Sequence, residues 1–196
     1  MTCRLVSALA FSALSAWYAT AAVDVTLLGA KNDGSADVSD IVNEATVKDA
    51  LFFPAGVYKV AKPLRLRNSV RGAGFARVPY KVDASRTWLV SAIPDEGGLA
   101  GVIEFADNTS ATVEDLSIRC NGAVNGIRIA NCTQGMMLDI RRLGIFDVSS
   151  CGLFVEGSGS RTVFAGDLTI WGEPASMSRS VAIRLGGACG TLYGAV

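Results

Sequence analysis

From about residue 100 onward, apolar and polar residues alternate in short runs that are separated by Gly, Asn and Ser. Three of these runs have an apolar-x-apolar core after a polar residue: DLSI at 115–118, RLGI at 142–145 and DLTI at 167–170. Their leucines, Leu116, Leu143 and Leu168, recur at nearly equal intervals. Alternation with a period of two indicates β-strands, and a recurrence of about 25 residues indicates a repeated structural unit.

Two further series share this period. Ile127, Leu153 and Ile183 form one, and Val113, Leu138 and Val163 form the other. Three strands in each period are typical of a coil in which equivalent strands of successive turns pair in parallel, about 4.8 Å apart. The pattern therefore predicts an all-β fold, a right-handed parallel β-helix, with the leucine and isoleucine columns inside. The alternative is an antiparallel sandwich, which favours hairpin spacings of about 8–12 residues.

The N-terminal part has a different pattern. In SADVSDIVNEAT, at 35–46, Val38, Ile41, Val42 and Ala45 lie on one face of a helix that has Asp37 as its N-cap. A short helix of this kind would cap the open end of a coil. The next segment, LFFPAGVYKV at 51–60, is expected to form two strands around a Pro-Ala-Gly corner. Residues 75–98 are interpreted as an insertion or an elaborated loop.

Residues 1–21 are expected to be a signal peptide that is followed by one domain, 22–196. Arg4 precedes an apolar stretch, which ends at the small residues of ATA at 19–21. A membrane anchor is the alternative, but the apolar stretch is short for a span. The expected localisation is therefore secreted, extracellular or periplasmic, with no membrane association of the mature form.

Charge and composition exclude several classes of function. The chain has 18 basic and 18 acidic residues, so it lacks the excess of basic residues that is typical of nucleic-acid-binding proteins. It contains no histidine, which excludes His-based triads and His-ligated zinc. Beyond the leader it has four cysteines, Cys120, Cys132, Cys151 and Cys189, and three pairings are open. Cys120 has inward parity, so a buried thiol and a disulfide are both open for it.

Three motifs, in order, carry a resemblance to a known family. They are VTLLGAKNDGSADVSD at 25–40, in which Asp33 and Asp37 match the family opening, then LFFPAGVYKV, and then LRLRNSVRGAGF at 64–75. The set resembles the start of the pectate-lyase-like (rhamnogalacturonase- and epimerase-type) β-helix domain, a pectin-lyase-like solenoid. Turn and cap roles are the simpler explanation for Asp33 and Asp37 than metal binding.

The resemblance implies a secreted carbohydrate-active protein with a polysaccharide as its partner. The chain would be the N-terminal part of a polysaccharide lyase or a glycoside hydrolase acting on a pectin-like acidic polymer. Ca²⁺ is implied by the family only, and no cofactor or metal ligand is assigned. Because Val196 falls in or just after the fourth recognisable turn, we expect a C-terminally truncated, inactive chain, with missing turns or a partner chain over the open end.

The outward positions of the predicted strands supply the candidate site residues. Asp139, Asp147 and Asp167 are the candidates for catalysis, although none lies in a known acid/base motif. Arg128, Phe146, Trp171 and Arg184 are the candidates for substrate binding, because arginines pair with uronate carboxylates and aromatic rings stack on sugars. The alternative is a surface ladder of Asp115, Arg142 and Asp167, with the aromatics covered by a loop. The alternative function is a non-catalytic glycan-binding or structural β-helix, such as an adhesin or a tailspike-like stalk.

Overall fold

The computed structural model describes residues 21–78, 81–94, 100–105, 110–121, 125–130, 136–156, 161–172, 181–185 and 191–193. The predicted signal peptide, apart from Ala21, and Cys132 and Cys189 fall on residues outside these ranges. The described residues form one short α-helix, one 3₁₀ helix and strands that belong to two sheets.

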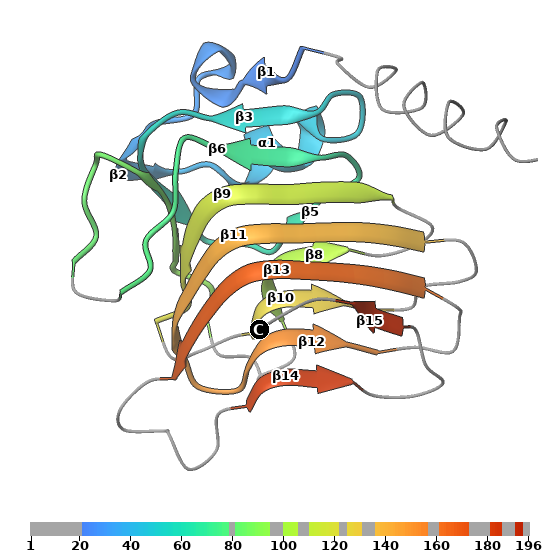
Figure 1. Ribbon diagram of the computed structural model, residues 1–196. Coiled ribbons are helices and arrows are strands. Elements are labelled where there is room, and N and C mark those ends of the chain that lie inside the picture. The colour runs from blue at the N-terminus through green and yellow to red at the C-terminus, as the bar shows by residue number, and fades with distance from the viewer. Residues whose placement is uncertain are drawn as a thin grey trace, which may run out of the picture.

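Sheet A contains ten strands, all in parallel pairs. They are β1 (Val23–Asp24), β2 (Asp33–Asp37), β3 (Leu51–Phe53), β4 (Gly56–Val60), β6 (Val70–Gly72), β7 (Thr87–Ser91), β9 (Ala111–Arg119), β11 (Met136–Val148), β13 (Arg161–Gly172) and β15 (Thr191–Tyr193). Sheet B is β5 (Leu64–Arg65), β8 (Gly101–Phe105), β10 (Asn125–Ile129), β12 (Cys151–Val155) and β14 (Val181–Leu185). The chain visits the two sheets in turn, so equivalent strands stack as a parallel β-solenoid (Figure 1). The predicted all-β parallel coil is confirmed.

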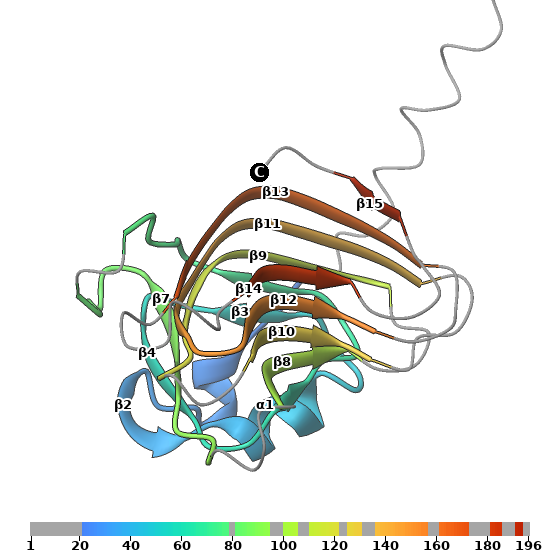
Figure 2. The same cartoon turned by 90° about the horizontal axis from the view of Figure 1, so that it is seen from below.

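The three longest strands of sheet A bend and so form two faces of the solenoid (Figure 2). The first half of β9 pairs with β6, and its second half pairs with β7. The bends lie at Asp115, Arg142 and Asp167, whose φ angles of 59°, 51° and 52° are in the left-handed region. In the earlier turn the same corner is made by the Pro-Ala-Gly segment between β3 and β4. There Gly56 has a φ of 150°, and a Cβ would lie 2.5 Å from the Asn32 carbonyl oxygen.

The core consists of the predicted aliphatic columns. Leu116 pairs with Leu143, which pairs with Leu168, and Ile127 pairs with Leu153, which pairs with Ile183. The members from the inner turns are fully buried, whereas Leu168 and Ile183 in β13 and β14 are partly buried.

The third predicted series is wrong at its first step. Val113 pairs with Ile140, and Leu138 pairs with Ala111. Each residue of β9 pairs with the residue of β11 that follows it by 27 positions, as Arg142 follows Asp115. This offset is the same before and after the bend, because each bent strand is continuous through both faces. The interval from Val113 to Leu138 is shorter than this offset. The predicted pairing in this series therefore holds only between Leu138 and Val163.

Sheet B approaches the second face of sheet A closely at two glycines. A Cβ on Gly126 would overlap Ile145 Cγ2, and a Cβ on Gly152 would lie 2.5 Å from Ile170 Cγ2. Only glycine fits at these positions without displacing the core.

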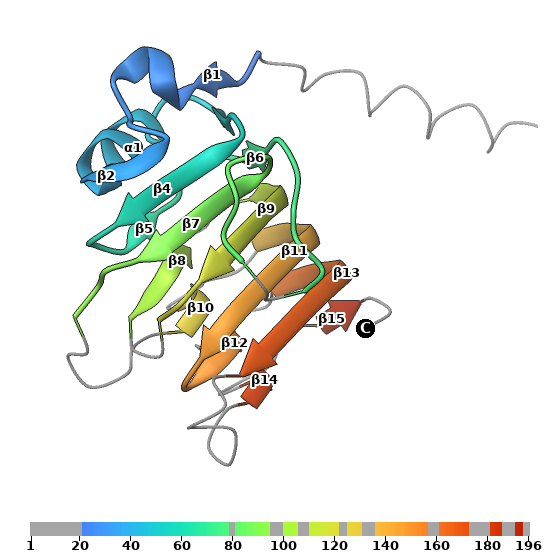
Figure 3. The ribbon, with the colours of Figure 1, turned by 90° about the vertical axis from the view of Figure 1, so that its left-hand side faces the viewer.

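The N-terminal end of the solenoid is covered by α1 (Ser39–Ala45) and the 3₁₀ helix η1 (Val25–Leu28), as Figure 3 shows. Val38 and Val42 are buried in the core, and Ile41 and Ala45 pack against it. Asp37 Oδ1 accepts hydrogen bonds from the backbone N of Ser39 at 3.1 Å and of Ala61 at 2.9 Å. Asp37 therefore ties the start of the helix to the next turn. The predicted capping helix is confirmed, but its predicted N-cap is wrong by one residue: the N-cap is Val38, which has no side chain able to cap, and Asp37 ends β2.

The interpretation of residues 75–98 as a loop is wrong in part, because Thr87–Ser91 is a regular core strand, β7, between β4 and β9. Its short alternation, TWLVS, lies beside irregular sequence and so gives a weak signal. The preceding residues, 73–78 and 81–86, form a segment that we call the strap. The strap lies over β9 and β11 (Figure 3), since Ala76 N donates to Ser117 Oγ at 2.7 Å. The Ala76 carbonyl oxygen also occupies the space that a Cβ on Gly144 would need.

Candidate functional site

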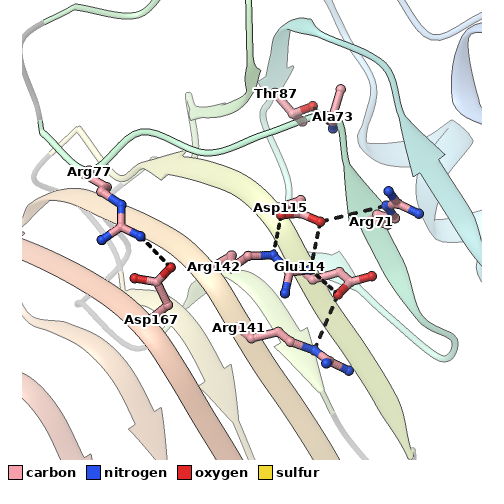
Figure 4. Close-up of polar contacts among 9 residues, drawn as sticks. All are labelled: Arg71, Ala73, Arg77, Thr87, Glu114, Asp115, Arg141, Arg142 and Asp167. Atoms are coloured by element: carbon pink, nitrogen blue, oxygen red, sulfur yellow. Dashed lines mark hydrogen bonds and ion pairs between the residues drawn. The ribbon is translucent and has the colours of Figure 1, made fainter. Parts of the chain in front are cut away.

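Charged side chains gather at the bend of sheet A in what we call the corner network (Figure 4). Its members are Arg71, Glu114, Asp115, Asp139, Arg141 and Arg142. Arg142 is the centre, with Nε at 2.6 Å from Asp115 Oδ1 and Nη2 at 2.6 Å from Glu114 Oε2. Arg71 contacts Asp115 at 3.8 Å, and Arg141 contacts Glu114 at 3.4 Å. Charges of opposite sign thus alternate from one turn to the next, as an exposed parallel stack requires.

This network holds the Asp115 carboxylate in the ionised form. The hydrogen bond from Arg142 lowers the pKa of Asp115, and the positive charges of Arg142, Arg71 and Arg141 act in the same direction against the effect of burial. An aspartate in this state accepts hydrogen bonds and does not supply a proton. The corner network is therefore suited to holding the bend and not to acid catalysis.

The three predicted catalytic carboxylates are not brought together. Asp139 pairs with Arg141 at 2.5 Å, Asp147 pairs with Arg119 at 2.7 Å, and Asp167 pairs with Arg77 of the strap at 2.8 Å. Each binds a different arginine, and no ion pair or hydrogen bond between the described residues joins two of them to one partner.

The two predicted aromatic residues have different environments. Phe146 is 0% exposed and packs beneath the strap with Ala76 and Trp88, whose ring centroid is 5.5 Å away. Its ring is therefore not accessible to a sugar. This is the alternative interpretation given above, in which a loop covers the aromatic residue. Trp171 is 47% exposed on β13.

The outer face of sheet B carries a second charged stack, which we call the outer column. It consists of Arg65, Glu104, Arg128, Phe154 and Arg184, which are direct neighbours on successive strands from β5 to β14. Two of these, Arg128 and Arg184, are predicted site residues, and their alignment with Phe154 follows the predicted register. Parallel pairing therefore places five outward side chains in one line, about 4.8 Å apart from strand to strand.

The middle of the outer column is neutralised within the protein. Arg128 donates from Nε to Glu156 Oε1 at 3.0 Å, and its Nη1 lies 3.7 Å from Glu104 Oε1. Glu104 also accepts the backbone N–H of Gly101 at 3.1 Å. Both side chains of the Arg128–Glu104 contact are largely covered, with exposed fractions of 23% and 17%. Arg128 is consequently committed to its two glutamates.

The two outermost described residues of the column, Arg65 and Arg184, are exposed. The Arg65 side chain is 77% exposed, and its contact with Glu104 is long, at 3.9 Å. Arg184 is exposed and lies with its guanidinium carbon 5.4 Å from the centroid of the Phe154 ring. Within the described ranges, no carboxylate forms an ion pair with Arg184. The pair is thus an exposed cation that lies over a half-buried aromatic ring.

Sequence reasoning missed Glu104 as a partner of Arg128. The signal was present, since GVIEF at 101–105 has the pattern of GIRI at 126–129 one turn later. Arg77 of the strap had no such signal, because its contact with Asp167 spans 90 residues.

Metal and thiol chemistry have no visible basis in this part of the chain. Among the described residues, no group of three or more Cys, Asp or Glu side chains is arranged to hold a metal ion. Cys120 and Cys151 are buried free thiols, and burial raises the pKa of both. Neither described helix has the length and apolar character that a bilayer span requires.

The fold and the two charged stacks define a parallel β-solenoid with an ion-paired bend and a partly open outer column. No protein-family model matches the sequence, and a comparison with curated protein sequences gave no match. The family resemblance of the sequence therefore stays a prediction.

Three solved structures are similar to the chain. ORF18 of Geobacillus virus E2 has a TM-score of 0.48 and 17% identity, over 84% of this chain and 41% of that one. The catalytic unit of a thermostable GH87 α-1,3-glucanase from Streptomyces thermodiastaticus has a TM-score of 0.45 and 18% identity, over 78% and 33%. The Agl-KA catalytic domain has a TM-score of 0.35 and 14% identity, over 88% and 48%. The chain thus spans less than half of each of these structures, and similarity at this level carries no argument about function.

Proposed function

We propose that the protein is an exported, carbohydrate-binding β-solenoid that binds an acidic, pectin-like polysaccharide on the outer face of sheet B. Export rests on the signal-peptide pattern of residues 1–21. The binding surface is the stacked pair of Arg184 and Phe154 in the outer column. Trp171, an exposed ring on the neighbouring sheet, is a second contact to be tested on its own.

One observation carries the choice of binding over catalysis. Every described carboxylate between residues 100 and 185 contacts an arginine: Glu104, Glu114, Asp115, Asp139, Asp147, Glu156 and Asp167. Each of these carboxylates is thus already engaged by a cation of the protein itself. Arg184 is the converse case, a cation without a carboxylate partner among the described residues.

The chemistry of Arg184 and Phe154 suits an acidic sugar. A guanidinium donates two parallel hydrogen bonds to one carboxylate, which an ammonium group cannot do. An aromatic ring beside it packs against the C–H face of a sugar ring, and removes apolar surface from water. Together they distinguish a uronate from a neutral hexose by charge and from a simple anion by the ring contact.

The test is a titration of the full-length protein with polygalacturonate by calorimetry at low salt. Arg184→Ala and Phe154→Ala are each expected to weaken binding by about tenfold, which corresponds to about 1.4 kcal/mol. The matched control is Arg86→Ala, which removes the same charge from an exposed position on the strap. Equal loss in Arg86→Ala would mean that only net charge matters, and absence of binding by the unchanged protein would overturn the proposal.

A polysaccharide-cleaving enzyme is the second candidate, since Glu104 and Glu156 both contact Arg128 from the same face. Two carboxylates on one face are the minimum for glycoside hydrolysis. Incubation with a panel of uronic-acid polymers tests this, with reducing ends and unsaturated products as the readout. Product formation that is abolished by Glu104→Gln and by Glu156→Gln would establish the enzyme, and no product from the unchanged protein would exclude it for those polymers.

A further inference from the structure

The outer column is unequal along its length. Its two end residues, Arg65 on β5 and Arg184 on β14, are exposed cations, and Arg128 between them is held by Glu104 and Glu156. The glutamate side chains at the centre are 17% and 30% exposed, so they present some negative charge to the same surface. A bound anion is therefore attracted to the ends of the column and not to its middle.

The distance between the ends follows from the strand order. Sheet B runs β14-β12-β10-β8-β5, so Arg65 and Arg184 are separated by four steps between neighbouring strands. At about 4.8 Å for each step, the backbones at the two ends are about 19 Å apart. No small anion contacts both arginines across this distance.

We propose that the ligand of this face is a linear glycan with negative charges separated along its length, which lies across the strands of sheet B and contacts Arg65 and Arg184 at once. This inference rests on the proposed function and adds a requirement for length and charge spacing. Two contacts on one chain make the second contact intramolecular, so a ligand that spans both ends binds more tightly than one that reaches a single end.

The experiment compares two probes, trigalacturonate, which is shorter than the column, and octagalacturonate, which is longer. The unchanged full-length protein is expected to bind the octamer at least tenfold more tightly than the trimer. Arg65→Ala is expected to remove most of this advantage and to leave trimer binding at Arg184 and Phe154 unchanged. Arg184→Ala is expected to weaken the binding of both probes.

Controls keep the outcomes separate. Arg86→Ala again removes one exposed charge outside the column, and thermal unfolding of each variant verifies the fold. If trimer and octamer bind equally and Arg65→Ala has no effect, the two-ended contact is overturned while the proposed function survives. If neither probe nor polygalacturonate binds, the proposed function fails and this inference fails with it.

Discussion

Asp115, Arg142 and Asp167 adopt a left-handed backbone without being glycine. Such a conformation costs about 1–2 kcal/mol for each residue with a Cβ. The ion pairs of the corner network offset part of this cost, because the bend directs Arg142 toward both Asp115 and Glu114. The position thus combines a strained backbone with close ion pairs between successive turns.

The pH dependence of stability tests the central pair of that network. Arg142 lowers the pKa of Asp115, so the stability it contributes is present above the usual value of 3.8 and is lost as pH falls through the lower pKa in the folded protein. Arg142→Gln is therefore expected to destabilise the protein at neutral pH, and the deficit should shrink as the pH falls below 3.8. Urea unfolding at several pH values measures this, and a deficit that does not change with pH would contradict it.

A second residue-scale prediction concerns the close approach of the two sheets. Gly126→Ala would put a methyl group 2.7 Å from the Gly152 carbonyl oxygen as well as against Ile145, so we expect a loss of about 1–3 kcal/mol in the free energy of unfolding. Gly166→Ala is the matched control, because its Cβ would meet no atom within 4 Å. That variant should be neutral or stabilised by up to about 1 kcal/mol. Equal effects in urea unfolding would show that the sheets do not meet at Gly126.

At the scale of elements, the strap explains why an outward aromatic residue is buried. Ser117 and Gly144 are small and leave room for the strap backbone, and Trp88 and Phe146 flank it. Thr87 Oγ1 accepts the N–H of Ala73 and donates to the Phe53 carbonyl oxygen, both at 2.8 Å, so the strap is fastened where it begins.

Hydrogen exchange tests the strap at one amide. Ser117→Ala removes the acceptor of the buried Ala76 N–H, and an unpaired buried donor costs about 1–3 kcal/mol. We expect exchange at Ala76 to quicken by about tenfold or more. The control is Thr169→Ala, two strands from Ser117 in the same outward column, whose side chain forms no hydrogen bond with the described strap residues. Unchanged exchange in Ser117→Ala would mean that this bond does not hold the strap.

The sequence pattern predicts those features that repeat and misses those that do not. The columns at Leu116 and Ile127 are visible as a period, and so is the alignment of Arg128 with Phe154 and Arg184. The strap crosses several turns once only, so no periodicity reveals that Arg77 meets Asp167 or that Phe146 is covered. Asp147 and Asp167 pair with arginines outside their own turns, which the period does not reveal, whereas Asp139 pairs with Arg141 on its own strand.

At the scale of the whole molecule, parallel stacking brings Arg65 and Arg184 into one line although they are distant in the chain. Within this line Arg128 contacts Glu104 and Glu156, whereas Arg184 lies against Phe154 and pairs with no carboxylate among the described residues. The proposed binding surface is thus a consequence of parallel stacking and of no local motif.

The most direct measurement is a backbone NMR titration of the full-length protein with octagalacturonate. The account predicts shifts of the amide signals of Phe154 and Arg184 on the outer face of sheet B, together with that of Arg65, and no shifts at Glu114 and Arg142 in the corner network. Shifts confined to the corner network, or no shifts at all, would contradict it.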